Sequence, residues 1–408
     1  MDYNVAYKKL ESLDVLGSCM GLDNMQRLLH ACSNPQNKLK VVHVAGTNGK
    51  GSVVSYLESI AVVSGVQCGA YTSPALTDFK ENIRVGGVQI GEADCAKLLG
   101  LLFDACQQMV ACGYTHPTRF EVETALAFLY FVDKGCEIVF LETGLGGALD
   151  ATHVVAKPIC VVLSRIGFDH MQELGSNLKE ITLAECGIFK RGVPVFTLIQ
   201  EPDVIGVIEC VCKKLSCSLA VAELYQGSLV SRANYARHNA GLAQAVAKHL
   251  GYAHRHIVEG LGYAHWFGRF SEVRFKEKNL TFILDGAHNI SAVEALVESL
   301  NHNYPNQKYI FIVGIFKDKQ VASMVQCIGS VAKKMVALGN KNNKRIMEAE
   351  SLKNHALQYI QNVHAVLTPL EAVEIALEGA SVQDVVVVCG SLSILADVYK
   401  EIINHGKD

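Results

Sequence analysis

The sequence predicts an α/β protein with two domains in tandem, each built around a parallel sheet. Short apolar runs that are typical of buried strands alternate along the chain with segments of helical spacing. Such alternation indicates a parallel sheet with helices on both faces. The chain has 408 residues, half of them hydrophobic, and is too long for one compact core. We therefore expect a P-loop-type parallel sheet domain followed by a smaller Rossmann-like α/β domain.

Five buried strands are expected in the first domain, because five runs of Val, Ile, Leu and Phe are bounded by glycine or polar residues. They lie at residues 39–46, 68–73, 136–143, 159–167 and 193–198. Helical spacing, with glycine near the ends, predicts the helices between them at residues 50–65, 93–113, 120–135 and 177–192.

The second domain is expected to repeat this alternation after a helix at residues 235–251 and the connector "GYAHWFGRF". Its strands are predicted at residues 280–289, 308–316, 333–339, 364–369 and 384–391, with a helix at 290–300. We therefore place the first domain at residues 1–264, the linker at residues 263–269 and the second domain at residues 270–408.

Composition and charge argue against several classes of partner. Lys and Arg number 37 against 40 Asp and Glu, and this net charge of −3 gives no footprint for nucleic acid or an anionic membrane. No apolar run is long enough to span a bilayer, and the N-terminus lacks the pattern of a signal peptide. Fourteen cysteines are scattered through apolar segments without zinc-binding spacing, as expected of small buried hydrophobes in a reducing cytoplasm.

The stretch "AGTNGKGS" at residues 45–52 indicates a phosphate-binding loop between a strand and a helix. Backbone N–H groups and the helix N-terminus would surround one spot, where glycines let the backbone approach phosphate oxygens. Lys50 would reach the β and γ phosphates, and Ser52 would cap the helix or touch a metal. The spacing departs from GxxxxGK[ST], and an ordinary glycine-rich turn is the alternative. Lysine between glycines directly after a buried strand favours nucleotide binding.

Three further strand ends carry polar residues that suit the metal of a nucleotide. Ser73 ends one predicted strand, Glu142 ends another, and His170 follows a third. Open α/β sheets bind ligands at the carboxyl ends of their parallel strands. A hydroxyl, a carboxylate and an imidazole make an acceptable Mg²⁺ site, although imidazole is a less usual ligand. Each residue alone could instead be a turn, surface or loop residue, but together with the phosphate loop they favour a metal site.

Seven motifs between residues 43 and 289 resemble the folylpolyglutamate synthase/dihydrofolate synthase family, the folate branch of the Mur ligase superfamily. They read "HVAGTNGKGS", "TSPALTDFKENIRVGG", "FEVETALAF", "GLGGALDAT", "IGFDHMQELG", "WFGRF" and "LDGAHN". The matches as a whole run in order from about residue 21 to residue 391. The resemblance implies that the first domain is like the Mur ligase central domain and holds the ATP and folate sites. It also implies that the second is a glutamate-ligase domain.

The resemblance implies an ATP-dependent ligase that adds L-glutamate to dihydropteroate or to the γ-glutamyl tail of a folate. A substrate carboxylate would attack the γ-phosphate, and the glutamate amine would displace phosphate from the resulting acyl phosphate. The cofactors would be ATP and Mg²⁺, with a second Mg²⁺ or a K⁺ as a further option. Family members are mostly monomers, so a monomer is expected.

Motif by motif, the resemblance assigns roles to individual residues. Those expected to contact ATP are Asn48, Gly49, Lys50, Gly51, Ser52, Asn239, Arg269, Asp285 and Ser391. Those expected to bind Mg²⁺ are Ser73, Glu142 and His170, and those expected in catalysis are Lys50, His170, Glu185 and His288. His288 and Ser391 also match positions linked to the glutamate site or to domain closure, although His288 could simply pack in a turn. Lys317 and Asp318 resemble an "RDKD"-like segment of the family, which is a less specific match than the motifs above.

The chain departs from the family pattern near these residues. The family usually has "EKAGI", with a carbamylated lysine that helps a second metal, where this chain has Ala184 and Glu185. Either Glu185 replaces the carbamate electrostatically, or it is a solvated helix carboxylate and the second metal is weak or lost. Ala148 stands where arginine is usual and His153 where asparagine is usual, which leaves their effect on folate binding open. Ala75 and Phe267 depart likewise.

Three functions remain open from the sequence. The favoured one is the folate ligase, without a choice between dihydrofolate synthase, folylpolyglutamate synthase or both. A Mur-type amino-acid ligase on another substrate is a rival, although only 45 residues precede Gly46, too few for a nucleotide-sugar domain. A catalytically impaired homologue that binds folate and ATP is the other.

Overall fold

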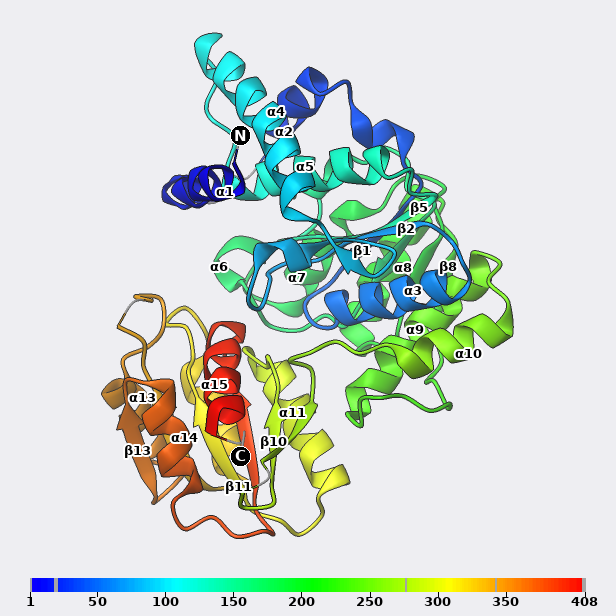
Figure 1. The fold of residues 1–408 in the computed structure, drawn as a ribbon. Coiled ribbons are helices and arrows are strands. Elements are labelled where there is room, and N and C mark those ends of the chain that lie inside the picture. The colour runs from blue at the N-terminus through cyan, green and yellow to red at the C-terminus, as the bar shows by residue number, and fades with distance from the viewer. Residues whose placement is uncertain (1, 18–20, 276, 342, 406–408) are drawn as a thin grey trace. The chain divides into compact units, whose positions relative to one another are not determined.

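The computed structural model describes residues 2–17, 21–275, 277–341 and 343–405 (Figure 1). The chain forms two compact units. The first contains Met1–Gly167, Met171–Ser228 and His238–Ala264, and the second contains Phe168–His170, Leu229–Arg237 and His265–Asp408. Two short stretches thus pack with the second unit although they precede its main part along the chain.

The sheet of the first unit has, among the described residues, eight strands in the order β4-β3-β2-β5-β1-β6-β7-β8. The five predicted strands are confirmed as β1 (Val41–Ala45), β2 (Cys68–Tyr71), β5 (Ile138–Glu142), β6 (Cys160–Leu163) and β7 (Val195–Thr197). They pair in parallel, and the residues of β1, β2, β5 and β6 are all buried, as central strands covered on both faces require.

The edges of this sheet were not predicted. A parallel strand, β8 (Leu219–Val221), extends one edge, and β3 (Ile83–Val85) with β4 (Val88–Gln89) forms an antiparallel hairpin at the other. Gly86 and Gly87 join β3 to β4 with positive φ angles of 59° and 82°, as a two-residue hairpin turn needs. The sheet is therefore mixed rather than parallel throughout.

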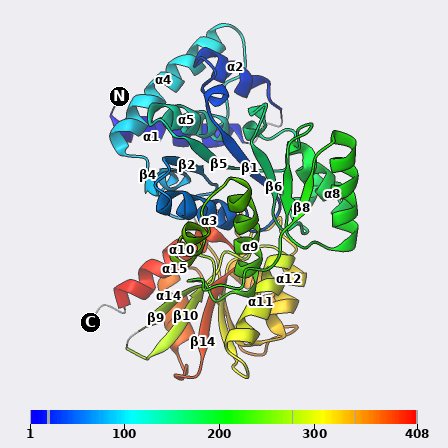
Figure 2. The same ribbon diagram turned by 90° about the vertical axis from the view of Figure 1, so that its right-hand side faces the viewer.

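Helices cover both faces of the first sheet (Figures 1 and 2). The α-helices are α1 (Tyr3–Glu11), α2 (Asp23–Ala31), α3 (Lys50–Val63), α4 (Glu92–Ala111), α5 (Arg119–Asp133), α6 (Met171–Leu174), α7 (Leu178–Glu185), α8 (Pro202–Leu215), α9 (Asn234–His249) and α10 (His254–Tyr263). The 3₁₀ turns are η1 (Ser12–Leu16), η2 (Pro35–Lys38), η3 (Phe79–Asn82), η4 (Ala151–Val154) and η5 (Cys186–Ile188). Helices α1, α2, α4 and α5 share one buried apolar cluster, and α3 packs against α10.

One predicted helix ends early. The sequence predicts a helix over residues 177–192, but α7 stops at Glu185 and η5 follows. Gly187 lies so close to the neighbouring loop that a Cβ there would be 2.4 Å from the Ala148 nitrogen. Tertiary packing therefore ends α7 where local helical spacing would continue it.

The second unit is a smaller α/β fold with strand order β13-β12-β11-β14-β10-β9 among the described residues. The strands are β9 (Ser271–Phe275), β10 (Leu280–Leu284), β11 (Tyr309–Val313), β12 (Ala332–Leu338), β13 (Val363–Val366) and β14 (Val385–Cys389). The five predicted strands pair in parallel, and β9 adds an antiparallel edge. Its helices are α11 (Ile290–Asn303), α12 (Val321–Gly329), α13 (Ala349–Ala356), α14 (Pro369–Leu377) and α15 (Leu392–His405).

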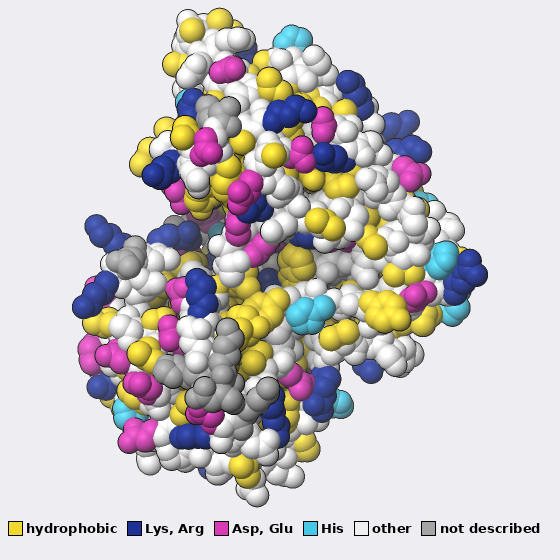
Figure 3. All heavy atoms as spheres, viewed as in Figure 1, with side chains coloured by type: hydrophobic (Ala, Val, Ile, Leu, Met, Phe, Trp, Pro, Cys, Tyr) yellow, Lys and Arg dark blue, Asp and Glu magenta, His cyan; other side chains and the backbone are white. Residues whose placement is uncertain are grey.

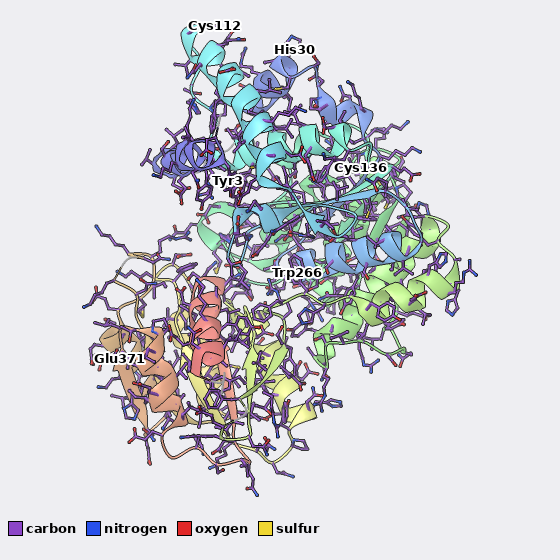
Figure 4. All side chains as sticks on the ribbon, in the orientation of Figure 1. Tyr3, His30, Cys112, Cys136, Trp266 and Glu371 are labelled. Atoms are coloured by element: carbon purple, nitrogen blue, oxygen red, sulfur yellow. The ribbon has the colours of Figure 1, made fainter. Side chains whose placement is uncertain are left out.

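Acidic and basic side chains are interspersed over the face drawn in Figure 3. Within the described residues, no helix combines the length and apolar character needed to cross a membrane. The thirteen cysteines that the structure describes are free thiols, among them Cys112 at the end of α4 and Cys136 before β5 (Figure 4). The expectation of buried cysteines holds only in part, because Cys112 and Cys210 are exposed and four others are half-buried among the described residues.

Candidate active site

The predicted phosphate loop runs from the end of β1 to the start of α3 and is tied to the segment after β6. The backbone N–H groups of Thr47 and Asn48 both donate to the Arg165 carbonyl oxygen, at 2.9 and 3.0 Å. The Thr47 hydroxyl donates to the Gly167 carbonyl at 3.1 Å and accepts from its N–H at 3.0 Å. These bonds fix the first part of the loop, so its N–H groups nearer α3 are the candidates for phosphate binding.

Two glycines of the loop are required by close packing. Gly46 and Gly49 have φ angles of 126° and 95°, which side chains rarely adopt. A Cβ at Gly46 would lie 2.4 Å from Ser164 Oγ, and one at Gly49 would lie 2.5 Å from Asn239 Oδ1. Asn239 is buried on α9, so the structure brings this expected nucleotide contact against the phosphate loop.

The start of α3 has the features of an anion site. Gly49 occupies the N-cap position without a side-chain cap, so the first-turn N–H groups of Lys50, Gly51 and Ser52 receive no cap bond from it. Such N–H groups, together with the helix dipole, favour phosphate. Lys50 folds back over the loop, where its Nζ donates to the Gly46 carbonyl oxygen at 2.8 Å. An ammonium group therefore stands beside the helix N-terminus.

Glu185, at the end of α7, lies at the base of the same loop. It is only 3% exposed, and its Oε2 accepts a 3.0 Å hydrogen bond from the Gly46 N–H. The alternative of a solvated helix carboxylate is therefore wrong. Burial of this carboxylate was missed because helical spacing alone does not show which neighbouring loop a helix end meets.

Ser73 and Glu142 come together at the ends of β2 and β5, which are neighbours in the sheet. The Ser73 N–H donates to Glu142 Oε2 at 3.3 Å, and Glu142 is 5% exposed. Within the described residues no cluster of three or more His, Cys, Asp and Glu could hold a metal ion. A hydroxyl and a carboxylate nevertheless fit Mg²⁺, which takes few protein ligands and completes its shell with water and phosphate oxygens.

His170, the third expected metal ligand, belongs to the segment that packs with the second unit. Its backbone is left-handed, with φ 47°, and its side chain is 39% exposed. The Nε2 atom lies 4.0 Å from Oδ2 of Asp169. Asp169 itself is buried and was not among the predicted site residues.

Asp169 is the centre of a buried polar cluster in the second unit. Lys319 Nζ lies 2.5 Å from Oδ1, and Oδ2 accepts from Asn289 Nδ2 at 3.0 Å and lies 3.3 Å from His288 Nε2. Burial alone would raise the pKa of Asp169, but His288 and Lys319 hold it well below its usual range. His288 is thus positioned by Asp169, and its Nδ1 donates to the Gly286 carbonyl at 2.7 Å.

The lysine that pairs with Asp169 is Lys319, whereas the sequence resemblance points to its neighbours Lys317 and Asp318. Lys317 and Asp318 have half-exposed side chains, whereas the side chain of Lys319 is only 6% exposed. The three residues are consecutive in the turn after β11, and nothing in their spacing shows which one points inward.

Asp285 and Ser391 accept hydrogen bonds from other residues of the second unit. The Asp285 carboxylate accepts from the N–H groups of Phe270 and Ala287, both at 2.9 Å, and from the Tyr235 hydroxyl. Burial raises the pKa of Asp285, and nearby Arg269 opposes this shift. Ser391 Oγ accepts from the Ser393 N–H at 3.1 Å, at the start of α15.

His153 and Ala148, two residues that depart from the family pattern, contact neighbouring segments of the first unit. His153 Nε2 accepts from Lys190 Nζ at 2.9 Å, and burial followed by the Lys190 charge lowers the pKa of His153 to about 4. Ala148 is exposed and lies against Gly187, where an added Cβ would be 2.4 Å from the Ala148 nitrogen.

Comparison with known proteins supports the family resemblance. Residues 268–392 match the model of the Mur ligase, glutamate ligase domain. The dihydrofolate synthase/folylpolyglutamate synthase of Bacillus subtilis is 29% identical over 94% of this chain and 95% of its own. The dihydrofolate synthetase of Saccharomyces cerevisiae is 31% identical over 75% of this chain and 78% of its own.

A solved structure extends the likeness to the whole fold. The bifunctional folylpolyglutamate synthase/dihydrofolate synthase of Yersinia pestis, complexed with AMPPNP and a Mn ion, is 27% identical with a TM-score of 0.84 over 98% of each chain. The chain therefore belongs to the dihydrofolate synthase/folylpolyglutamate synthase family of ATP-dependent ligases.

Proposed function

We propose that this protein uses ATP to join L-glutamate to dihydropteroate, to the γ-glutamyl tail of a folate, or to both. The observation that carries the proposal is the uncapped start of α3 beside Lys50, in a loop whose glycines pack against Ser164 and Asn239. That arrangement suits a polyphosphate. The relatives named above support glutamate and folate as the substrates.

The chemistry follows from the substrate. A carboxylate forms no amide without a leaving group, so one of its oxygens takes the γ-phosphoryl group of ATP, and ADP leaves. The amine of L-glutamate then attacks the acyl carbon, loses a proton, and phosphate departs. Lys50 and the first-turn N–H groups of α3 stabilise the negative charge on the phosphates during the transfer.

We further propose Ser73, Glu142 and His170 as ligands of a divalent cation, Mg²⁺ in the working enzyme. The bound cation would supply positive charge to the phosphoryl oxygens. Support comes from the Ser73–Glu142 contact and from the Mn ion in the Yersinia pestis structure. Glu185, buried at the phosphate loop, would add a negative charge that favours a second cation, either Mg²⁺ or K⁺.

For the other site residues we propose the roles that the family motifs imply. Asn48, Asn239, Arg269 and Asp285 would contact the nucleotide, and His288 and Ser391 would serve the glutamate site or domain closure. Packing of Asn239 on Gly49 supports the first of these roles. The carboxylate of Asp285 already accepts three hydrogen bonds from the protein, which supports a positioning role. We also propose residues 1–264 and 270–408 as the two functional domains, and a monomer that works in the cytoplasm.

A product-based assay tests the proposal. Purified protein is incubated with ATP, Mg²⁺, L-glutamate and either dihydropteroate or tetrahydrofolate, and the mass of the pterin product is measured together with released ADP. We expect a product heavier by one glutamyl residue and ADP release that needs both substrates. Lys50→Ala, which removes the ammonium of the loop, is the control. ATP binding without a glutamylated product would instead support the impaired homologue.

A further inference from the structure

A buried ion pair joins the helix of the phosphate loop to the strand beside Ser73. Glu58 lies on α3 and Arg84 on β3, and both side chains are at most 10% exposed. Arg84 Nε donates to both carboxylate oxygens of Glu58, at 3.1 and 2.9 Å. Arg84 Nη2 lies 2.8 Å from Glu58 Oε2. The guanidinium is therefore held in a fixed plane by α3.

The remaining nitrogen of the guanidinium, Nη1, reaches the loop that contains Ser73. It donates to Thr72 Oγ1 at 3.0 Å and to the Glu81 carbonyl oxygen at 2.5 Å. Thr72 N–H in turn donates to the Asn82 carbonyl at 3.0 Å. Arg84 thus donates hydrogen bonds to both ends of the loop over residues 72–82.

The interior of this loop is ordered by the Glu81 side chain. Its carboxylate accepts from the N–H groups of Leu76, Thr77 and Asp78 at 3.1 to 3.4 Å. Ser73, next to Thr72, donates its own N–H to Glu142. A continuous set of bonds therefore runs from α3 through Glu58, Arg84 and Thr72 to Ser73.

Stability alone does not account for the pair. Taking two charges out of water is costly, and apolar residues of similar size in the same place are often as stable or more so. What apolar residues cannot do is fix a hydroxyl in one orientation, because they offer no directional bond. The directional bonds of the pair therefore point to a role in fixing the position of Thr72 and Ser73.

We propose that Glu58 and Arg84 are positioning residues that hold Ser73 in place for the divalent cation bound with the nucleotide. This inference rests on the proposed metal site at Ser73 and Glu142. Removal of a group that hydrogen-bonds to a metal ligand and orients it typically lowers metal affinity by about 10- to 100-fold. The pair also connects that orientation to α3, whose first turn is the proposed phosphate site.

The test measures how much metal strengthens nucleotide binding. The dissociation constant of AMPPNP is determined by calorimetry once with Mn²⁺ and once with EDTA, and the ratio of the two values is the metal gain. In the double variant Glu58→Leu/Arg84→Met we expect the metal gain to fall by at least about tenfold. Binding in EDTA should stay at the wild-type value, which a merely structural loss would not allow.

A control at a more exposed ion pair and a second variant complete the design. Asp94→Asn/Lys134→Gln removes another ion pair of the same unit, with a 2.9 Å contact outside the Ser73 loop, and should keep the full metal gain. Thr72→Val keeps the charged pair and removes only the bridging hydroxyl. Its metal gain should fall by about threefold or more, and this variant decides the question should the double variant fail to fold.

The outcomes separate the inference from the function on which it rests. Ser73→Ala should abolish most of the metal gain; if it does not, the proposed metal site fails. If Ser73→Ala loses the gain while Thr72→Val or the folded double variant keeps it, the positioning role alone is overturned. Equal weakening in Mn²⁺ and in EDTA would also overturn it.

Discussion

The Gly46 N–H donates a 3.0 Å hydrogen bond to the carboxylate of Glu185, and Glu185 is almost wholly buried. A residue at the end of α7 therefore holds the first amide of the phosphate loop. Gly46 also approaches Ser164 too closely for any side chain. The loop is thus fixed from two sides, which would lower the entropy lost on ordering the phosphate that we propose binds there.

Substitution of Glu185 should separate its structural role from its charge. Glu185→Ala leaves a buried N–H without an acceptor, so we expect a loss of about 1–3 kcal/mol in the free energy of unfolding. Glu185→Gln keeps an oxygen acceptor and should lie within about 1 kcal/mol of wild type. We expect it to lose about tenfold in kcat. Urea unfolding and the glutamate-addition assay measure the two effects; full activity of Glu185→Gln would show that the charge is not needed.

The contact between Gly49 and Asn239 predicts a partial rescue. Gly49→Ala adds a Cβ at φ 95°, 2.5 Å from Asn239 Oδ1, and should cost about 1–3 kcal/mol and raise the KM for ATP. The double variant Gly49→Ala/Asn239→Ala removes the clash but not the backbone strain. We expect its stability to lie between those of Gly49→Ala and the single Asn239→Ala control. Simple addition of the two single effects in thermal unfolding would contradict this prediction.

The central strands of both sheets could be predicted because each is a continuous apolar run between polar or glycine residues. Strands β3, β4 and β8 could not, since each has only two or three residues and none is buried along its whole length, unlike the equally short β7. Strand β9 was missed for a related reason: only its first and last residues, Ser271 and Phe275, are buried. Edge strands lack the two-sided burial that makes the others visible in sequence.

The candidate site divides in the same way. Gly46, Lys50, Ser73 and Glu142 could be predicted because each belongs to a local motif at a strand end. The pairing of Asp169 with Lys319 could not, because these residues are 150 positions apart and only the fold brings them together. Local spacing also cannot show that the carboxylate of Glu185 turns inward to an amide of another segment.

Lys319 should matter far more for stability than its two neighbours. Lys319→Met removes the closest cation from the buried Asp169 carboxylate, and we expect a loss of about 3–5 kcal/mol in unfolding free energy. Lys317→Ala and Asp318→Ala change half-exposed side chains and should stay within about 0.5 kcal/mol of wild type. Chemical denaturation of the three variants checks this order. Equal effects at all three positions would argue against the buried pair.

A buried histidine should make stability depend on pH below neutrality. His43 lies on β1, where burial, followed by the charges of His153 and Lys190, lowers its pKa to about 3. Its Nε2 contacts Thr152 Oγ1 at 2.8 Å, and that hydroxyl bonds to Asp150, while Nδ1 has no partner within the described residues. The folded protein therefore keeps this ring neutral, whereas the unfolded chain takes up a proton near pH 6.5.

The stability that the neutral ring contributes is fully present above pH 6.5 and declines as the pH falls toward 3, because only the unfolded chain binds the proton in that range. Proton linkage gives a loss of about 2 kcal/mol between pH 7.5 and pH 5. His43→Leu removes the titrating group and leaves the Thr152–Asp150 bond intact. We expect its unfolding free energy, measured in urea across this range, to fall about 2 kcal/mol less than that of wild type. Parallel pH profiles for the two proteins would show that His43 is not the group responsible.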